Sequence, residues 1–353
     1  DDDDDDDDDA DARTTTTTSS TSWSRMWNEQ YQKVNRNLVD RFESIEEFFI
    51  SMRSPYHQKE FIETAFTYGK IIISERGLAP PLKTIKPVNI GGIAGGDKYI
   101  HHGILFKFAL DPVIATEPTT MYMYGGDKPN DEKAMKAAAR DLLGRDRYWG
   151  TFTHGLHYPM MVLIDYVGFR LVAMPLLPID HSTLIYGSSD GGRTVHTDDE
   201  AFNELMRQAG ERLNVKAHVV GADASQVIYG PGDIEGHRGH DGRYYVLDYA
   251  RTCPPEAPPR DRTAPSYDAR GVFYKLLRPE FLRKYKNTLC CDAFTRWDYD
   301  PVAAAANRRD VREATDYLYD TVIPRFAAKV DAELAAFAPT GGPCSTTFAP
   351  PTA

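Results

Sequence analysis

The segment 232–256 constrains the fold of this chain more than any other. Its Asp241-Gly-Arg turn is typical of a tight hairpin, because Asp and Gly tolerate the left-handed backbone conformations that such turns need. Aromatic and branched residues at 244–249 then predict a strand that carries Asp248 near its end. The double proline at 254–255 closes the strand, since proline has no N–H to donate to a neighbouring strand. The segment therefore predicts a hairpin that places a carboxylate at the end of a buried strand.

Composition indicates a folded protein of ordinary make-up with one charged tail. A chain of 353 residues, 41% of them hydrophobic, can bury a sizeable core as one large or two modest domains. The net charge of −11 comes almost entirely from the acidic residues of 1–11, so the rest of the chain is nearly neutral. The four cysteines are too few and too irregularly spaced for a disulfide framework, which favours a reducing, cytoplasmic setting. The most apolar run, 160–179, is interrupted by charges and prolines, so we expect no membrane insertion.

Four regions are predicted along the chain. Residues 1–22 are an Asp/Thr/Ser-rich tail with too little apolar surface to fold, and we expect them to be disordered. Residues 23–285 form the main domain, residues 286–338 a C-terminal helical extension, and residues 339–353 a loose tail rich in Pro, Gly and Thr.

Hydrophobic spacing predicts the helices. Apolar residues recur at helical spacing over 23–52, which indicates two helices with a break near Glu43. Residues 60–68 predict a helix and residues 70–74 a strand. Further helices are predicted at 131–143, closed by Gly144, at 198–213, at 279–285 and at 310–337, the last kinked by Pro324.

The predicted strands complete an α+β fold. A strand is expected at 104–111, and the hairpins 160–177 and 234–249 with the strand 184–187 are expected to form one antiparallel sheet packed by helices. The Pro/Arg-rich segment 254–266 is predicted to be an exposed linker. This order of parts also allows a degenerate kinase-like two-lobe arrangement.

Local patterns give little support for metal or nucleophile chemistry. His154 and His157, and again His237 and His240 with Asp241 nearby, could supply imidazole and carboxylate ligands. Neither pair has the helical spacing that sets two rings on one face, and histidine in glycine-rich turns more often caps backbone groups, so we predict no metal. No Gly-x-Ser-x-Gly nucleophile turn is present, and Cys253 before two prolines is best interpreted as a small buried residue. We therefore assign no catalytic residue.

Phosphoryl transfer is the serious enzymatic alternative. A strand-terminal Asp holds Mg²⁺ over the phosphates in kinase-like folds, a role open to Asp248, with Asp233 as a second carboxylate and Arg170 or Lys107 as a phosphate contact. ATP and Mg²⁺ would then be the cofactors. No His-Arg-Asp loop and no glycine-rich loop in the usual place are found, which favours a non-catalytic scaffold. A third interpretation is that Asp248 forms a structural ion pair with Arg251. By the same reasoning, Arg243 could form a structural ion pair with Asp241 or Asp190.

Three ordered blocks resemble one known family. The segment 236–255 resembles the pattern Gly-His/Ile-x-Gly-x-Asp-Gly-Arg-x-Tyr-x-Leu-Asp-x-x-Arg-Thr-x-Pro-Pro of the clustered-mitochondria (Clu) domain family. Residues 162–173 resemble its Val-x-Asp-Tyr-x-Gly-x-Arg block, and residues 184–195 its Val-Tyr-Gly-Ser-x-Asp-x-Gly-Lys-Thr-Val block. The likeness covers roughly residues 25–285. The residues that carry it, expected to form a signature surface, are Asp165, Gly168, Arg170, Tyr186, Gly187, Asp190, Gly192, Gly236, His237, Gly239, Asp241, Gly242, Arg243, Asp248 and Arg251.

The resemblance implies a binding module rather than an enzyme. Clu proteins are implicated in binding messenger RNAs for mitochondrial proteins and in distributing mitochondria through the cytoplasm, so RNA or a ribonucleoprotein is the implied partner. The candidates for nucleic-acid binding are four cations in the segment 278–286, which also has aromatic residues nearby: Arg278, Arg283, Lys284 and Lys286. Acidic residues are interleaved with the chain's cations, as on ordinary solvated faces, so the RNA role depends on the resemblance. A scaffold that docks a protein partner is a further alternative.

Overall fold

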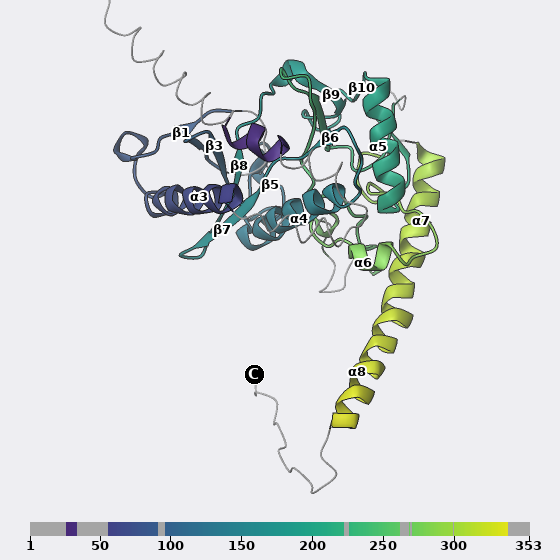
Figure 1. The fold of residues 1–353 in the computed structure, drawn as a ribbon. Coiled ribbons are helices and arrows are strands. Elements are labelled where there is room, and N and C mark those ends of the chain that lie inside the picture. Colours follow the sequence, from purple (N-terminus) through teal and green to yellow (C-terminus); the bar gives the residue numbers. More distant parts are fainter. Residues whose placement is uncertain are drawn as a thin grey trace, which may run out of the picture.

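The computed structural model describes residues 26–33, 56–90, 96–221, 226–261, 268, 270–298 and 300–337. Helices and antiparallel sheets are both present, and Figure 1 shows them in two halves joined by α4 (Asp131–Trp149). The α+β class predicted from the sequence is therefore confirmed. No helix in the described ranges is long and apolar enough to cross a membrane. The tail at 1–22, the tail at 339–353 and most of 23–52 lie outside the described residues, although residues 26–33 are helical.

The first half is a five-stranded sheet with helices on one face. The strand order is β1-β2-β3-β8-β7, with every neighbouring pair antiparallel. Its strands are β1 (Pro87–Val88), β2 (Lys98–His101), β3 (Ile104–Phe108), β7 (Val162–Tyr166) and β8 (Phe169–Pro175). The helix at 26–33 supplies Trp27 and Tyr31 to a buried core that also contains Phe61 of α3 (Tyr56–Ser74) and Phe106 of β3.

The α3 helix corrects one prediction. Residues 70–74 were expected to form a strand because they are rich in β-branched residues, but the helix runs without a break through Ser74. Ile72 and Ile73 are buried, so tertiary packing outweighs their local preference for strand. Gly69 brings α3 close to β7, since a Cβ at this position would lie 2.6 Å from Ile164 Cδ1.

The second half contains the hairpin that opens the sequence argument. Its sheet order is β10-β9-β13-β14-β6, antiparallel except for the parallel pair β14–β6. Its strands are β6 (Leu156–His157), β9 (Leu184–Gly187), β10 (His196–Thr197), β13 (Glu235–Arg238) and β14 (Tyr244–Leu247). The helix α5 (Glu200–Leu213) packs on it through Phe202 and Met206, and Asp199 caps that helix.

Two strand pairs and several short helical turns complete the described chain. The pairs are β4 (Val113–Ala115) with β5 (Met121–Tyr122), and β11 (His218–Val220) with β12 (Gln226–Ile228). The 3-10 turns are η1 (Pro80–Leu82), η2 (His181–Thr183) and η3 (Gly271–Phe273).

The predicted single sheet is wrong, because its strands fall into two sheets. The hairpin β7–β8 belongs to the first sheet, whereas β9, β13 and β14 belong to the second. Pro175 ends β8 and Pro178 follows soon after, so the chain leaves the first sheet before β9 begins. The hairpins themselves were predicted correctly, and the error lies in their pairing, which depends on long-range contacts.

The helix α4 is longer than predicted. It was expected to end at Gly144 but continues to Trp149, and Gly150 is its C-cap. Gly144 is buried inside the helix, where an added Cβ would lie 2.3 Å from Tyr249 O. Glycine at this position serves a close contact between α4 and the segment after β14, rather than a helix end.

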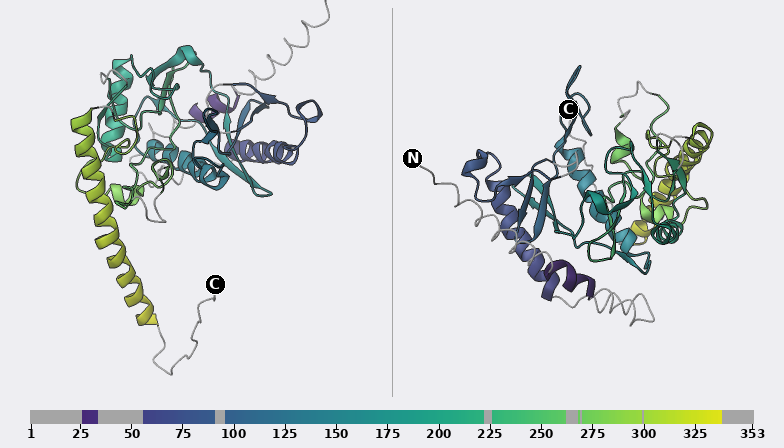
Figure 2. Two further views of the ribbon diagram at one scale, coloured as in Figure 1. Left: turned by 180° about the vertical axis from the view of Figure 1, so that it is seen from behind. Right: turned by 90° about the horizontal axis from the view of Figure 1, so that it is seen from above.

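The C-terminal helices form a rod at the end of the molecule opposite α3; its first part lies along the second half, and its last part extends beyond the body of the protein (Figure 2). The rod comprises α7 (Pro301–Tyr317), a π-helical turn (Leu318–Val322) and α8 (Ile323–Phe337). The predicted long helix thus begins earlier than expected, and the irregular turn lies directly before Pro324, the residue predicted to disturb it.

The segment after β14 corrects the predicted linker. Residues 254, 255 and 257 are buried, and Ala257 packs with Val311 of α7 and Leu282 of α6 (Pro279–Leu282). Ala257 N–H donates to Thr315 Oγ1 at 2.9 Å, which ties the segment to α7. The segment is therefore packed against a third hydrophobic core, which it shares with α6 and α7. In the described part of 254–266, only residues 259–261 are exposed.

Candidate functional site

The opening hairpin ends in a residue with an uncommon backbone conformation. β14 ends at Leu247, and Asp248 then adopts a left-handed conformation with φ of 57°. Outside glycine this conformation is uncommon, and Asp is among the residues that adopt it most readily. The carboxylate of Asp248 reaches the first sheet, where Lys107 Nζ on β3 lies 3.8 Å from Asp248 Oδ1. One ion pair therefore links the two halves of the protein.

Further charged groups surround this ion pair. Lys98 lies opposite Lys107 in the register of β2 and β3, and Asp141 of α4 is buried and accepts a backbone hydrogen bond at 2.8 Å. Burial first, and then the negative charge of Glu235, raise the pKa of Asp248 to about 7 against the opposing charge of Lys107. The Asp248 side chain is still 48% exposed, so water screens part of this effect. Lysine and carboxylate side chains therefore form a charged cluster between the two sheets.

Arg251 belongs to a separate buried network. It donates to Asp233 through Nε at 2.9 Å and Nη2 at 2.7 Å, and Nη1 donates to Asp292. Asp292, with a fully buried side chain, also pairs with His218 Nε2 at 2.9 Å. Burial opposes the charge on Asp292, but Arg251 outweighs it and lowers the pKa of this carboxyl. The alternative in which Asp248 pairs with Arg251 is therefore wrong, because each has other partners.

The expected phosphate contact Arg170 is used within the fold. It pairs bidentately with Asp165, at 2.6 Å and 2.7 Å, across the turn that Gly168 closes with φ of 81°. Arg170 Nη1 also donates to Met135 O at 2.7 Å. Of the two cations considered for a phosphate, Lys107 is the one that the structure brings to Asp248.

The other signature residues support the hairpins from inside or hold turns. Arg243 pairs with Asp241 at 2.8 Å, and Asp190 accepts from Ser188 Oγ at 2.9 Å. The expected signature surface is wrong for many of these residues, because they are buried, and the buried glycines let a backbone or side chain approach closely. The buried members are Tyr186, Gly187, Gly192, Gly236, His237, Gly239 and Arg251, and the exposed ones are Asp165, Gly168, Asp190, Asp241, Gly242 and Asp248.

His237, His240 and Cys253 have local partners or are buried, whereas His154 is exposed and His157 Nδ1 lies 3.2 Å from Tyr244 O. His237 Nδ1 lies 3.0 Å from Thr183 Oγ1, and His240 Nε2 pairs with Asp180 at 2.8 Å. Within the described ranges, no group of three His, Cys, Asp or Glu side chains could hold a metal ion. Cys253 is buried, and burial raises the pKa of its thiol to about 12.

The four nucleic-acid candidates gather at one short helix. Arg278 precedes α6 and the other three cations follow it, all of them exposed. The Phe281 and Tyr285 rings are stacked, with centroids 5.2 Å apart, and Tyr317 of α7 lies 6.0 Å from Tyr285. Arg278 pairs with Glu280 at 3.4 Å. Arg283, Lys284 and Lys286 form no ion pair with another described residue, and we call the cations and rings together the α6 face.

Sequence patterns missed several charged groups that the fold brings together. Lys98, Asp141 and Glu235 stand in different elements and share no motif, so only the three-dimensional structure places them near Asp248. Asp292 directly follows the two adjacent cysteines, 290 and 291. The apolar character of these neighbours was the only feature of the sequence that indicated the burial of Asp292.

Comparison with known proteins identifies the class. The family described as Clustered mitochondria (CLU) matches residues 26–258, well over half of the chain. The chain therefore belongs to the Clustered mitochondria family. No solved structure matches it.

The similar proteins carry names of the same kind. The chain is 26% identical over 279 residues to a Clustered mitochondria protein homolog of Anopheles gambiae, which covers 76% of this chain and 17% of that protein. It is 26% identical over 299 residues to the Clustered mitochondria protein of Arabidopsis thaliana, covering 74% and 20%. With Protein clueless of Drosophila virilis it shares 28% identity over 240 residues, covering 66% and 15%. The chain thus spans a fifth or less of these relatives.

Proposed function

We propose that this chain is a non-enzymatic binding module that takes part in the distribution of mitochondria in the cytoplasm and contacts messenger RNA or a ribonucleoprotein. The names of its relatives support the link to mitochondria. The partner and the mode of binding are argued from the chain's own residues.

The α6 face is the observation that carries the RNA partner. Three exposed cations without a described ion pair stand beside three rings, of which Tyr317 is 45% exposed, Tyr285 is half-buried and Phe281 is buried. Cations neutralise phosphates, and exposed rings stack on unpaired bases, which are the two contributions that single-stranded RNA binding needs. The cations lie on a buried base, since Phe281 and Leu282 anchor α6 to the third core. The face is therefore held in place before any RNA arrives.

Fluorescence anisotropy of labelled single-stranded RNA tests the proposal. The variant Arg283→Gln/Lys284→Gln/Lys286→Gln should bind about tenfold more weakly or worse, because three phosphate contacts are lost. The matched control removes three exposed cations elsewhere, as Lys59→Gln/Arg325→Gln/Lys329→Gln, and should bind RNA as the wild type does. Equal affinity in the two variants would remove the α6 face from the proposal.

A second candidate is nucleotide binding between the sheets. It is favoured by the Lys107–Asp248 ion pair, in which a strand lysine meets a carboxylate held in a left-handed conformation. Carboxylates there would hold Mg²⁺ and the lysine would contact a phosphate, so ATP and Mg²⁺ are the proposed ligands.

A thermal-shift titration separates this candidate from the first. ATP with Mg²⁺ should raise the melting temperature by mass action, and the rise should disappear in Asp248→Asn but persist in the exposed control Asp165→Asn. No rise in the wild-type chain would reject nucleotide binding and leave the RNA proposal untouched.

A further inference from the structure

A second cluster of cations consists of three arginines on α7 and one on the segment that follows β14. A pocket of about 380 Å³ is lined by three arginines of α7, by one arginine of the preceding segment and by one aromatic ring. The lining residues are Arg260, Phe294, Arg308, Arg309, Arg312, Glu313 and Asp316. α7 buries Ala304, Asn307, Val311, Ala314 and Thr315 against the protein, so the lining side chains of this helix occupy its outward face. We call this site the α7 pocket.

One arginine is held in place by the fold, and a second is held only weakly. Arg312 Nη2 donates to Pro258 O at 2.7 Å, and its guanidinium lies 5.6 Å from the centroid of the Phe294 ring. These partners orient the side chain without neutralising its charge. Arg260 pairs with Asp316 at 3.2 Å, and with side chains 77% and 48% exposed this pair is weak.

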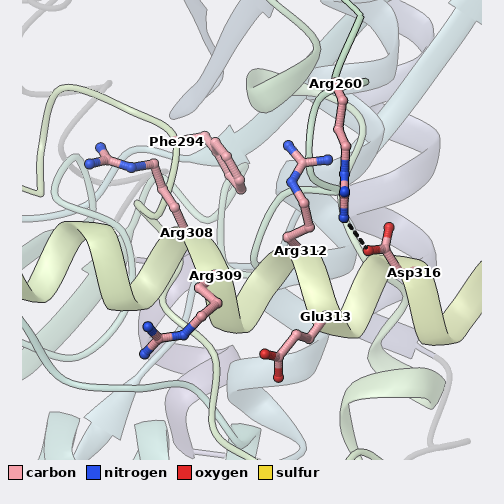
Figure 3. Close-up of a pocket in the computed structure, with 7 residues that line it drawn as sticks. All are labelled: Arg260, Phe294, Arg308, Arg309, Arg312, Glu313 and Asp316. Atoms are coloured by element: carbon pink, nitrogen blue, oxygen red, sulfur yellow. Dashed lines mark hydrogen bonds and ion pairs between the residues drawn. The ribbon is translucent and has the colours of Figure 1, made fainter.

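The other two arginines leave positive charge unbalanced. Arg308 and Arg309 form no hydrogen bond or ion pair with another residue of the described chain. Burial raises the pKa of Asp298, and the charge of Arg308 is among the influences that oppose this rise without cancelling it. Figure 3 shows Arg308, Arg312 and Arg260 extending on the side of α7 that carries Phe294, whereas Arg309 and Glu313 extend the other way. All three line the pocket; Arg312 and Arg260 lie next to each other, and Arg308 extends away from them beyond Phe294.

The chemistry of these groups specifies an anion with adjacent phosphates. A guanidinium donates two parallel hydrogen bonds to a phosphate, so several of them in one pocket match several phosphates on one small molecule. The volume lies within the usual range for small-molecule sites. RNA is a poorer match than at the α6 face, because the pocket has a single ring and Arg312 already lies over it, which leaves no free platform for a base.

We propose that the α7 pocket binds a small molecule that carries two or more clustered phosphates. Arg308 and Arg312 are its principal contacts, with Arg260 exchanging Asp316 for the ligand. The site is independent of the α6 face and of the Lys107–Asp248 pair, so its failure or success leaves those proposals unchanged.

Isothermal titration of the full chain with pyrophosphate and with inositol hexakisphosphate tests the site. Both probes should bind the wild type, the hexakisphosphate more tightly, with affinity that falls as salt rises. The variant Arg308→Gln/Arg312→Gln should lose about tenfold or more in affinity, since two charge-assisted contacts are removed. The control Arg325→Gln/Lys329→Gln removes the same charge from α8 and should bind as the wild type does.

A single variant guards against loss of folding. Arg312 holds Pro258 O, so the double variant is accompanied by Arg308→Gln, whose side chain has no described hydrogen bond to lose, and that variant should also weaken binding. No binding of either probe to the wild type would overturn the proposal, and so would an equal loss in the control. If labelled RNA, but neither phosphate probe, binds in a manner that depends on Arg308, the pocket belongs to RNA and the proposal is wrong.

Discussion

Neutralising Asp292 tests the buried network most severely. Asp292→Asn keeps the shape of the side chain but removes the charge that faces Arg251 and His218, so no large cavity confuses the result. The Arg251 side chain is 4% exposed, and taking away one partner leaves it short of neutralisation in a place that water does not reach. Removing one member of a buried ion pair costs about 3–5 kcal/mol. Since Asp233 still pairs with Arg251, we expect a loss of about 3 kcal/mol, the lower end of that range.

Urea denaturation with tryptophan fluorescence measures this loss. Trp297 is a suitable reporter, because the Arg251 guanidinium lies 5.8 Å from its ring centroid. The control is Asp165→Asn, which breaks a bidentate pair whose carboxylate is 62% exposed and should cost about 0–1 kcal/mol. A loss for Asp292→Asn no greater than that of the control would refute the claim that Asp292 is needed to neutralise the buried charge of Arg251.

The same network predicts a dependence of stability on pH. Burial alone would lower the pKa of His218, but its neighbours Cys290 and Asp292 outweigh burial and raise the pKa from 6.5 to about 10. A histidine with a raised folded-state pKa contributes fully below its unfolded pKa, and the contribution is lost as pH rises through the folded value. The wild type should therefore exceed His218→Gln in urea midpoint most at about pH 6, and the difference should shrink toward about pH 10. A difference that grows over this range would contradict the assignment.

Two further predictions concern residues of the family signature, Gly187 and Asp248. Gly187→Ala should destabilise the protein by more than about 2 kcal/mol, because φ is +77° and the added Cβ would lie 1.7 Å from Ile234 O. The control Gly191→Ala has a similar φ of +78° but open space around the Cβ, and should cost only about 1 kcal/mol. Melting temperatures compare the two variants, and similar losses would refute the steric argument. The pKa of Asp248, raised from 3.8 to about 7, means that the folded state holds this proton more tightly, so stability should fall as pH rises through that interval. Asp248→Asn should lessen the fall, and an unchanged pH profile would show that the carboxyl titrates normally.

Local sequence signals predicted the elements of the fold well where the physics is local. The turns at Gly168 and Gly242 follow from backbone conformation, which a few neighbouring residues determine. Gly144 misled the prediction for the opposite reason. It lies inside a helix to admit a distant partner, and that partner cannot be read from nearby residues.

The candidate site was predictable only in part. The position of Asp248 at a strand end followed from the hairpin pattern, but its partner Lys107 comes from a strand of the other sheet. Which carboxylates would surround it, and which acid would pair with Arg251, depended on the assignment of the hairpins to two sheets rather than one. The α7 pocket depends on a buried proline segment that composition alone marked as an exposed linker.

The salt dependence of RNA affinity tests the central claim most directly. For single strands, the logarithm of the binding constant falls with the logarithm of salt concentration by about 0.7 for each phosphate neutralised. The wild-type chain should show a clear slope, and Arg283→Gln/Lys284→Gln/Lys286→Gln should reduce it by about 2, the loss of three contacts. The Lys59→Gln/Arg325→Gln/Lys329→Gln control should keep the wild-type slope. An absence of RNA binding at low salt, or the same slope in all three proteins, would contradict the proposal that the α6 face is an RNA-binding surface.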